Sequence, residues 1–67
     1  MNKLKELRKN AGYTALQFAM MTGIPLSTIH AYEQGKRSLR GCKLDRLFKM
    51  AEALNMDFNT FITYVSK

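Results

Sequence analysis

Residues 14–37 read TALQFAMMTGIPLSTIHAYEQGKR and contain two short helical segments with a glycine between them. Thr14 and Gln17 have the spacing of a capping box, in which Thr14 accepts from the Gln17 amide while the Gln17 side chain reaches back. The first helix is therefore predicted to begin at Ala15. Gly23 accommodates the positive φ of a C-cap, so this helix is predicted to end there.

The second helix is predicted to run from about Pro25 to Gln34. Proline is tolerated in the first turn of a helix but not in its interior, and Gly35 stands where a C-cap would end the segment. Ile29 and Tyr32 occupy its core-directed positions. The other side of this helix therefore carries small and polar residues.

Three further amphipathic segments flank this pair, one before it over about residues 2–11 and two after it. The later two cover about residues 44–54 and a segment opened by Met56 or Asp57. The sequence thus predicts the all-α class, as a compact five-helix bundle forming one domain over residues 1–67. The residues expected in its core are Leu4, Leu7, Phe18, Ala19, Ile24, Ile29, Tyr32, Leu44, Leu47, Phe48, Ala51, Leu54, Phe58, Phe61 and Ile62. The methionines expected to fill gaps in it are Met20, Met21, Met50 and Met56.

Eleven basic residues against five acidic ones give the chain a formal net charge of +6. The excess lies in two blocks, residues 1–10 and 36–46, and the charges from residue 47 onward sum to zero. A basic surface is most often only solvated, but these blocks enclose the helix pair, which favours binding of nucleic acid. The single Cys42 closes no internal disulfide, and no apolar run approaches the ~20 residues that cross a bilayer. A cytoplasmic protein without membrane contact is expected.

The stretch from Leu7 to Ile62 resembles the Cro and phage-repressor (XRE-like) type of helix-turn-helix domain. The resemblance is carried above all by G-I-P-x-S-T-I-x-x-Y-E-x-G-K-R, residues 23–37, which follows a capped short helix. It implies a lambda-repressor-like fold and a sequence-specific transcriptional repressor with the helix at about residues 25–34 in the major groove of double-stranded DNA. A homodimer on an inverted-repeat operator is expected, because one short helix buries too little surface for tight specific binding. The lack of any sensor or catalytic domain in the chain suits a regulator from a phage, a mobile element or a restriction-modification system.

The resemblance also implies roles for single residues. Base edges are expected to meet Leu26, Ser27, His30 and Ala31. Phosphates are expected to meet Ala15, Thr28, Gln34, Lys36, Arg37 and Arg40. A structural clamp between the first and third helices is expected from Arg8 and Glu33. Ala15 stands where the family commonly has a Gln, and the base-facing set lacks Arg, Asn and Gln, so direct base readout is expected to be modest.

A protein-interaction module on the same scaffold, such as an antitoxin-like or anti-repressor partner, is the alternative interpretation. The weak base-facing set favours it, and the basic residues at 36–46 oppose it. An enzyme is not expected, because the chain offers no nucleophile with a base, no metal-ligand cluster and no phosphate-binding loop. No cofactor or metal is expected, since His30 has no second ligand near it in the sequence, and Cys42 is interpreted as a small, partly buried filler.

Overall fold

The computed structural model describes residues 3–66. These residues form five α-helices and one short 3-10 helix, with no strand among them. The elements are α1 (Lys3–Asn10), α2 (Ala15–Thr22), α3 (Leu26–Glu33), η1 (Leu39–Gly41), α4 (Leu44–Ala53) and α5 (Phe58–Val65). The predicted all-α class and five-helix bundle are confirmed for this part of the chain. Within it, no helix combines the length and apolar character that crossing a membrane requires.

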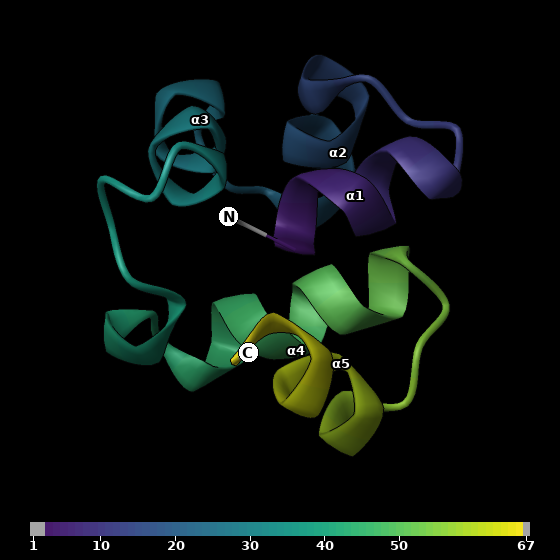
Figure 1. Ribbon diagram of the computed structural model, residues 1–67. Coiled ribbons are helices and arrows are strands. Elements are labelled where there is room, and N and C mark those ends of the chain that lie inside the picture. The colour runs from purple at the N-terminus through teal and green to yellow at the C-terminus, as the bar shows by residue number, and fades with distance from the viewer. Residues whose placement is uncertain (1–2, 67) are drawn as a thin grey trace.

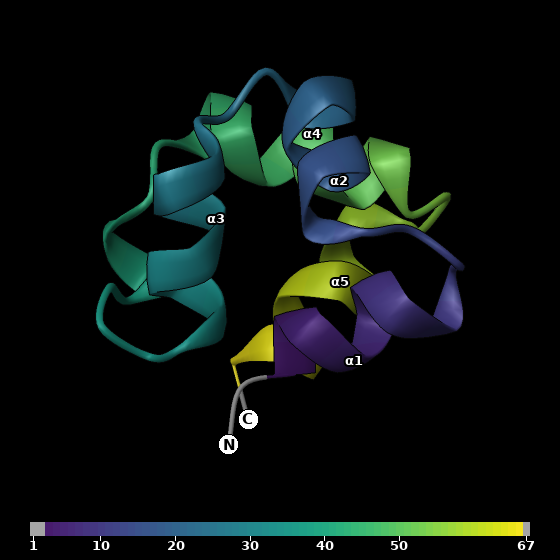
Figure 2. The same cartoon turned by 90° about the horizontal axis from the view of Figure 1, so that it is seen from above.

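The helices pack in two layers. In Figure 1, α1, α2 and α3 lie above α4 and α5, and Figure 2 shows the same arrangement from above. α2 packs against both α3 and α4, and α1 packs against both α3 and α5. Two helices of the upper layer therefore hold α3 and connect it to the lower layer.

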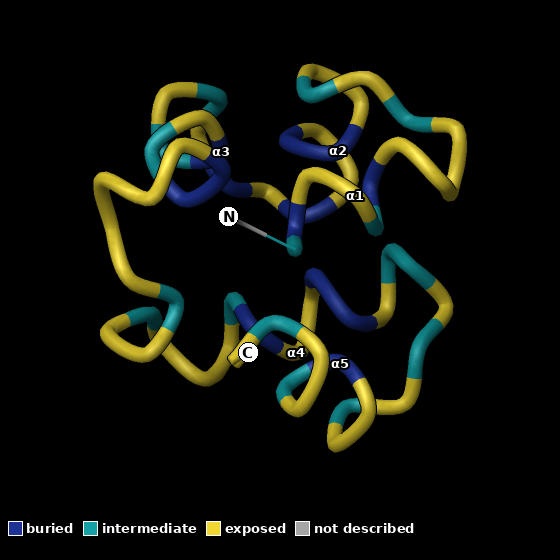
Figure 3. The backbone as a smooth tube through the Cα atoms, viewed as in Figure 1, coloured by how far each residue is buried: buried dark blue, intermediate teal, exposed yellow. Residues whose placement is uncertain are grey.

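The core lies between the two layers, and Figure 3 shows buried residues in every α-helix. Its buried members are Leu4, Phe18, Ala19, Ile24, Ile29, Tyr32, Leu47, Met50, Ala51 and Phe61. All of these were expected in the core or, for Met50, as its filler. Four more of the predicted core residues pack against this cluster while partly buried, namely Leu7, Leu54, Phe58 and Ile62. Cys42 and Met56 are partly buried there as well.

The core positions assigned to Leu44 and Phe48 are wrong, because these side chains are 59% and 50% exposed. The strip of α4 that contains Leu47 and Met50 faces the core. Leu44 and Phe48 occupy the neighbouring strip. The apolar stripe of α4 is therefore wider than the part of it that meets the core.

The filler role assigned to Met20 and Met21 is also wrong, since both are exposed. α2 reaches the core through Phe18, Ala19 and Thr22. These inward positions leave the two methionines on the outer side of a helix that has only one buried face.

The predicted helix ends are present around the helix pair. Thr14 Oγ1 accepts from the Gln17 amide at 3.1 Å, and the Thr14 amide donates to Gln17 Oε1 at 2.9 Å, which completes the capping box. α2 ends at Thr22, and its C-cap Gly23 has a φ of +71°, in the left-handed region that glycine adopts without strain. Farther along, the Asp57 carboxylate caps α5 by accepting from the Thr60 amide at 3.2 Å.

Candidate nucleic-acid interface

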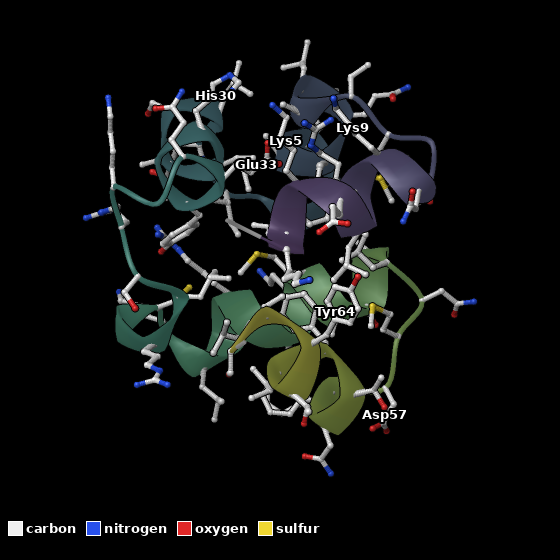
Figure 4. All side chains as sticks on the ribbon, in the orientation of Figure 1. Lys5, Lys9, His30, Glu33, Asp57 and Tyr64 are labelled. Carbon is white, nitrogen blue, oxygen red and sulfur yellow. The ribbon has the colours of Figure 1, made fainter. Side chains whose placement is uncertain are left out.

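The exposed face of α3 is a row of four small or polar residues. Ser27, His30, Ala31 and Gln34 are spaced i, i+3, i+4 and i+7, so they share one side at the helix and its C-cap. Ser27, His30 and Gln34 are exposed, and Ala31 is half-buried. Figure 4 shows His30 pointing outward from α3. Most of the residues assigned to base edges thus lie together on an open surface.

The opposite side of α3 is seated in the core through Ile29 and Tyr32, as predicted. Leu26 is half-buried and packs against the core, so only part of its side chain is available to a partner. Burial raises the pKa of the Tyr32 phenol, a hydrogen bond with Cys42 adds to the rise, and Arg46 opposes part of it. The burial of Ile29 and Tyr32 fixes which face of α3 turns outward.

Arg8 and Glu33 join α1 to α3 across 25 residues of sequence. Arg8 Nε donates to Glu33 Oε2 at 2.6 Å, and Nη2 donates to Oε1 at 3.0 Å. Nη1 of the same guanidinium donates to the Tyr13 carbonyl at 2.8 Å, so the linker before α2 is held as well. The hydrogen bond to Glu33 raises the pKa of Arg8, against a smaller opposing effect of burial. Whether this buried pair clamps α3 energetically stays a prediction.

Thr22, which was not among the predicted site residues, is buried at the C-terminal end of α2, next to the turn that leads to α3. Its hydroxyl donates to the Phe18 carbonyl at 2.8 Å and accepts from the Ile24 amide at 3.4 Å. A threonine near a helix end has no sequence signal that distinguishes this bridging role from simple solvent exposure. The turn is therefore held by a side chain as well as by Gly23.

Hydrogen bonds hold the backbone of the segment after α3, which carries the basic residues Lys36, Arg37 and Arg40. The amides of Lys36 and Arg37 both donate to the Ala31 carbonyl, at 2.9 and 3.2 Å. Ser38 Oγ then accepts from the Arg40 amide at 3.1 Å and caps η1. All three basic side chains are exposed. They lie directly beyond the C-terminal end of α3 because hydrogen bonds hold the chain there.

Ala15 and Thr28, the other residues assigned to phosphates, are half-buried. Ala15 packs against the core, and its side chain has no polar atom. A phosphate could meet it only through its backbone amide, since the first amides of a helix have no partner inside that helix.

Lys5 and Lys9 were not among the predicted site residues. They stand i, i+4 on α1 and are exposed, and Figure 4 shows both extending toward the side of the molecule where His30 lies. The sequence placed them in its first basic block, and the expected clamp joined α1 to α3, but neither showed that these two side chains extend toward the side where His30 lies. Positive charge thus borders α3 on two sides.

A cavity of about 350 Å³ lies between the end of α3 and the start of α4, and Arg37, Lys43 and Arg46 are among the residues that line it. It adds cations at the same border of the surface. Within residues 3–66, no group of three or more His, Cys, Asp or Glu side chains is arranged to hold a metal ion.

A family model described as helix-turn-helix matches residues 4–61, which include all of α2, α3 and α4. No curated protein matches the chain.

Proposed function

The chain belongs to the Cro and phage-repressor type of helix-turn-helix proteins, which are DNA-binding regulators rather than enzymes, and on this premise we propose that it represses transcription with α3 in the major groove. The observation that carries the proposal is the open row from Ser27 to Gln34 on a helix whose other side is buried. The major groove admits one α-helix, and the preceding helix crosses the backbone.

Within this surface, base and phosphate contacts fall to different residues. Ser27 and His30 each offer a hydrogen-bonding group to base edges, and Ala31 offers a methyl to thymine. Lys36, Arg37 and Arg40 border α3 as phosphate contacts, and Lys5 and Lys9 extend that positive border along α1. The cations thus position the protein on the duplex, and α3 supplies the sequence preference.

The proposed binding unit is a homodimer on an inverted repeat. One eight-residue helix presents too few base contacts for tight specific binding, and a two-fold dimer places two such helices about 34 Å apart, in successive major grooves. A regulator of this size, in the cytoplasm of a phage-bearing or mobile-element-bearing cell, would then act by occupying its operator.

Selection of bound sites from random duplexes tests the proposal, followed by sedimentation of the protein with a selected duplex. We expect an enriched inverted repeat and a stoichiometry of two chains per site. One chain saturating a single half-site would contradict the dimer. Failure to enrich any sequence would contradict specific DNA binding.

The second candidate function is a partner-binding module that retains the scaffold. It is favoured by one observation: none of the residues on the exposed row that were assigned to base edges is an Arg, Asn or Gln, the side chains that make bidentate base contacts. Enrichment of a defined operator in the same selection would decide against it.

A further inference from the structure

An exposed apolar groove lies between α4 and α5. Phe48 stacks on Phe58, with ring centroids 4.1 Å apart and an interplanar angle of 23°, and yet half of Phe48 remains open to water. Leu44, one turn before Phe48, is also exposed. A cavity of about 670 Å³ beside the stacked rings is lined by both of them and by Met56. Phe58 and Met56 also pack against the core, whereas the exposed Phe48 and Leu44 lie outside the core cluster.

The rim of the groove is acidic in an otherwise basic protein. Asp45, Glu52 and Asp57 line it, and they are three of the five acidic residues in the chain. Lys49 lines it too and lies 3.8 Å from Asp45. Among residues 3–66, neither Glu52 nor Asp57 forms an ion pair, and the Asp57 carboxylate accepts only from the first turn of α5, which it caps. We call this surface the acidic groove.

The other two acidic side chains are both paired. Glu33 is buried against Arg8, and Glu6 lies 3.9 Å from Lys3. The acidic groove is therefore where negative charge is concentrated on the described surface. A cation approaching a chain of net charge +6 is repelled by the rest of the molecule and attracted here.

The acidic groove also faces away from the DNA-binding surface. It belongs to the lower layer in Figure 1, and Figure 4 shows Asp57 at the opposite side of the molecule from His30. If α3 binds DNA as proposed above, the groove stays open to solvent. Its charge and its position both exclude DNA as the occupant.

We propose that the acidic groove docks a cationic amphipathic helix of a partner protein. An apolar residue of that helix packs on Phe48 and Phe58, and its Lys or Arg residues meet Glu52 and Asp57. Helices commonly bind in this way, with an apolar face in a groove and charges that set the pairing.

A second copy of this chain fits the groove poorly. A two-fold contact would bring two acidic rims together, and like charges oppose such a contact. A head-to-tail contact would instead use the basic surfaces that the proposed function reserves for DNA. Charge complementarity therefore points to a partner with a positive helix.

The test uses a fluorescent synthetic helix of leucine and lysine as the probe, with a leucine and glutamate helix as the charge-reversed control. Anisotropy measures affinity, and amide chemical shifts locate the site on the full chain. We expect only the cationic helix to bind, with shifts confined to α4, α5 and the loop between them. Glu52→Lys should weaken binding about tenfold or more.

Glu6→Lys is the matched control, because it makes the same charge change at an exposed acid on α1. Asp57→Asn supplies a milder variant that retains a helix-capping side chain. Equal weakening by Glu52→Lys and Glu6→Lys would reduce the effect to net charge and overturn the proposal. Shifts outside the groove, or no binding of the cationic helix, would overturn it too.

A second copy of this chain is the remaining possible occupant of the groove. Sedimentation of the free chain and of its Phe48→Ser variant tests for it. A self-association that Phe48→Ser abolishes would mean that a second copy fills the groove, which contradicts a partner helix. DNA binding is measured on the same proteins. A wild-type chain that binds the cationic helix but no duplex would reject the proposed function and leave the groove intact.

Discussion

The guanidinium of Arg8 and the carboxylate of Glu33 lie side by side with two nitrogen–oxygen contacts, of 2.6 and 3.0 Å, and their side chains are only 9% and 4% exposed. The two-point geometry is the strongest form of an arginine–carboxylate contact. It connects the first helix to the helix that is proposed to read DNA. Removing either partner would leave the other charge buried without its counter-ion.

We therefore expect Arg8→Ala and Glu33→Ala each to lower the free energy of unfolding by roughly 3–5 kcal/mol. The double variant should lose clearly less than the sum of the two. Urea denaturation of all four proteins gives the coupling energy. Should either variant prove unfolded, Arg8→Lys and Glu33→Gln provide a gentler cycle. A coupling near zero would show that the pair does not clamp α3.

Lys36→Ala with Arg37→Ala is expected to weaken binding to all duplexes alike. Each lost phosphate contact should reduce the slope of log affinity against log salt by about 1, so the double variant should lose about 2. Lys49→Ala on α4 is the matched single-charge control for Lys36→Ala, and it should leave the slope nearly unchanged. Anisotropy with operator and scrambled duplexes at several salt concentrations measures both quantities. An unchanged slope in the double variant would remove these residues from the interface.

Ser27→Ala and His30→Ala should act differently, because they lie on the exposed row of α3. Each is expected to alter preference at particular base pairs by about 1 kcal/mol, at the low end of the usual range, with little change in salt slope. Competition among single-base operator variants measures that preference. Identical preference profiles for wild type and both variants would mean that α3 does not read bases through these residues.

Gly23→Ala is expected to destabilise the fold by about 1–2 kcal/mol, because an L-residue is strained in the left-handed region. The φ of Gly23 is +71°, and a Cβ there would meet no atom within 4 Å, so strain alone is tested. Gly41→Ala is the control, since Gly41 has equal space and no positive φ. It should be neutral or slightly stabilising. Thermal denaturation of both variants decides, and equal midpoints would refute the role of the turn.

The raised pKa of Tyr32 predicts a loss of stability in alkaline solution. The folded state favours the neutral phenol, so its contribution is complete below the ordinary pKa of about 10 and is lost as pH rises through the higher folded value. Between these values the free energy of unfolding should fall by up to about 1.4 kcal/mol per pH unit.

Denaturation of wild type and Tyr32→Phe, at pH values on both sides of 10, measures this effect. The variant should lack the additional alkaline slope. Tyr64→Phe on α5 is the control and should keep the slope of the wild type. Parallel curves for wild type and Tyr32→Phe would contradict the prediction.

Much of the fold could be predicted because its helix boundaries are local. The Thr14 capping box and Gly23 act through neighbours within a few residues, so the sequence displays them directly. Phe48 was misplaced for the opposite reason. α4 carries apolar residues on two adjacent strips, and the strip that meets the core depends on how α2 and α5 pack against it.

The candidate site, like the fold, could be predicted from the sequence only in part. The open row on α3 could be predicted because Ile29 and Tyr32 fix the rotation of that helix. Lys5 and Lys9 were missed because their position beside α3 depends on the packing of α1. The expected pair of Arg8 and Glu33 joins α1 to α3, but it does not by itself determine which other side chains of α1 lie beside that helix.

Within residues 3–66, the longest helix is α4, with ten residues. Isolated helices shorter than about 12–15 residues are marginal in water, so each helix here persists only through the packing of the others. If the chain binds an operator as proposed, folding and operator occupancy share one equilibrium. By mass action, DNA at about a hundred times its dissociation constant adds roughly 2.7 kcal/mol to the stability of the folded chain. A weakened variant could thus be degraded when free and persist when bound, so that the number of intact regulators in a cell follows the number of operators available to them.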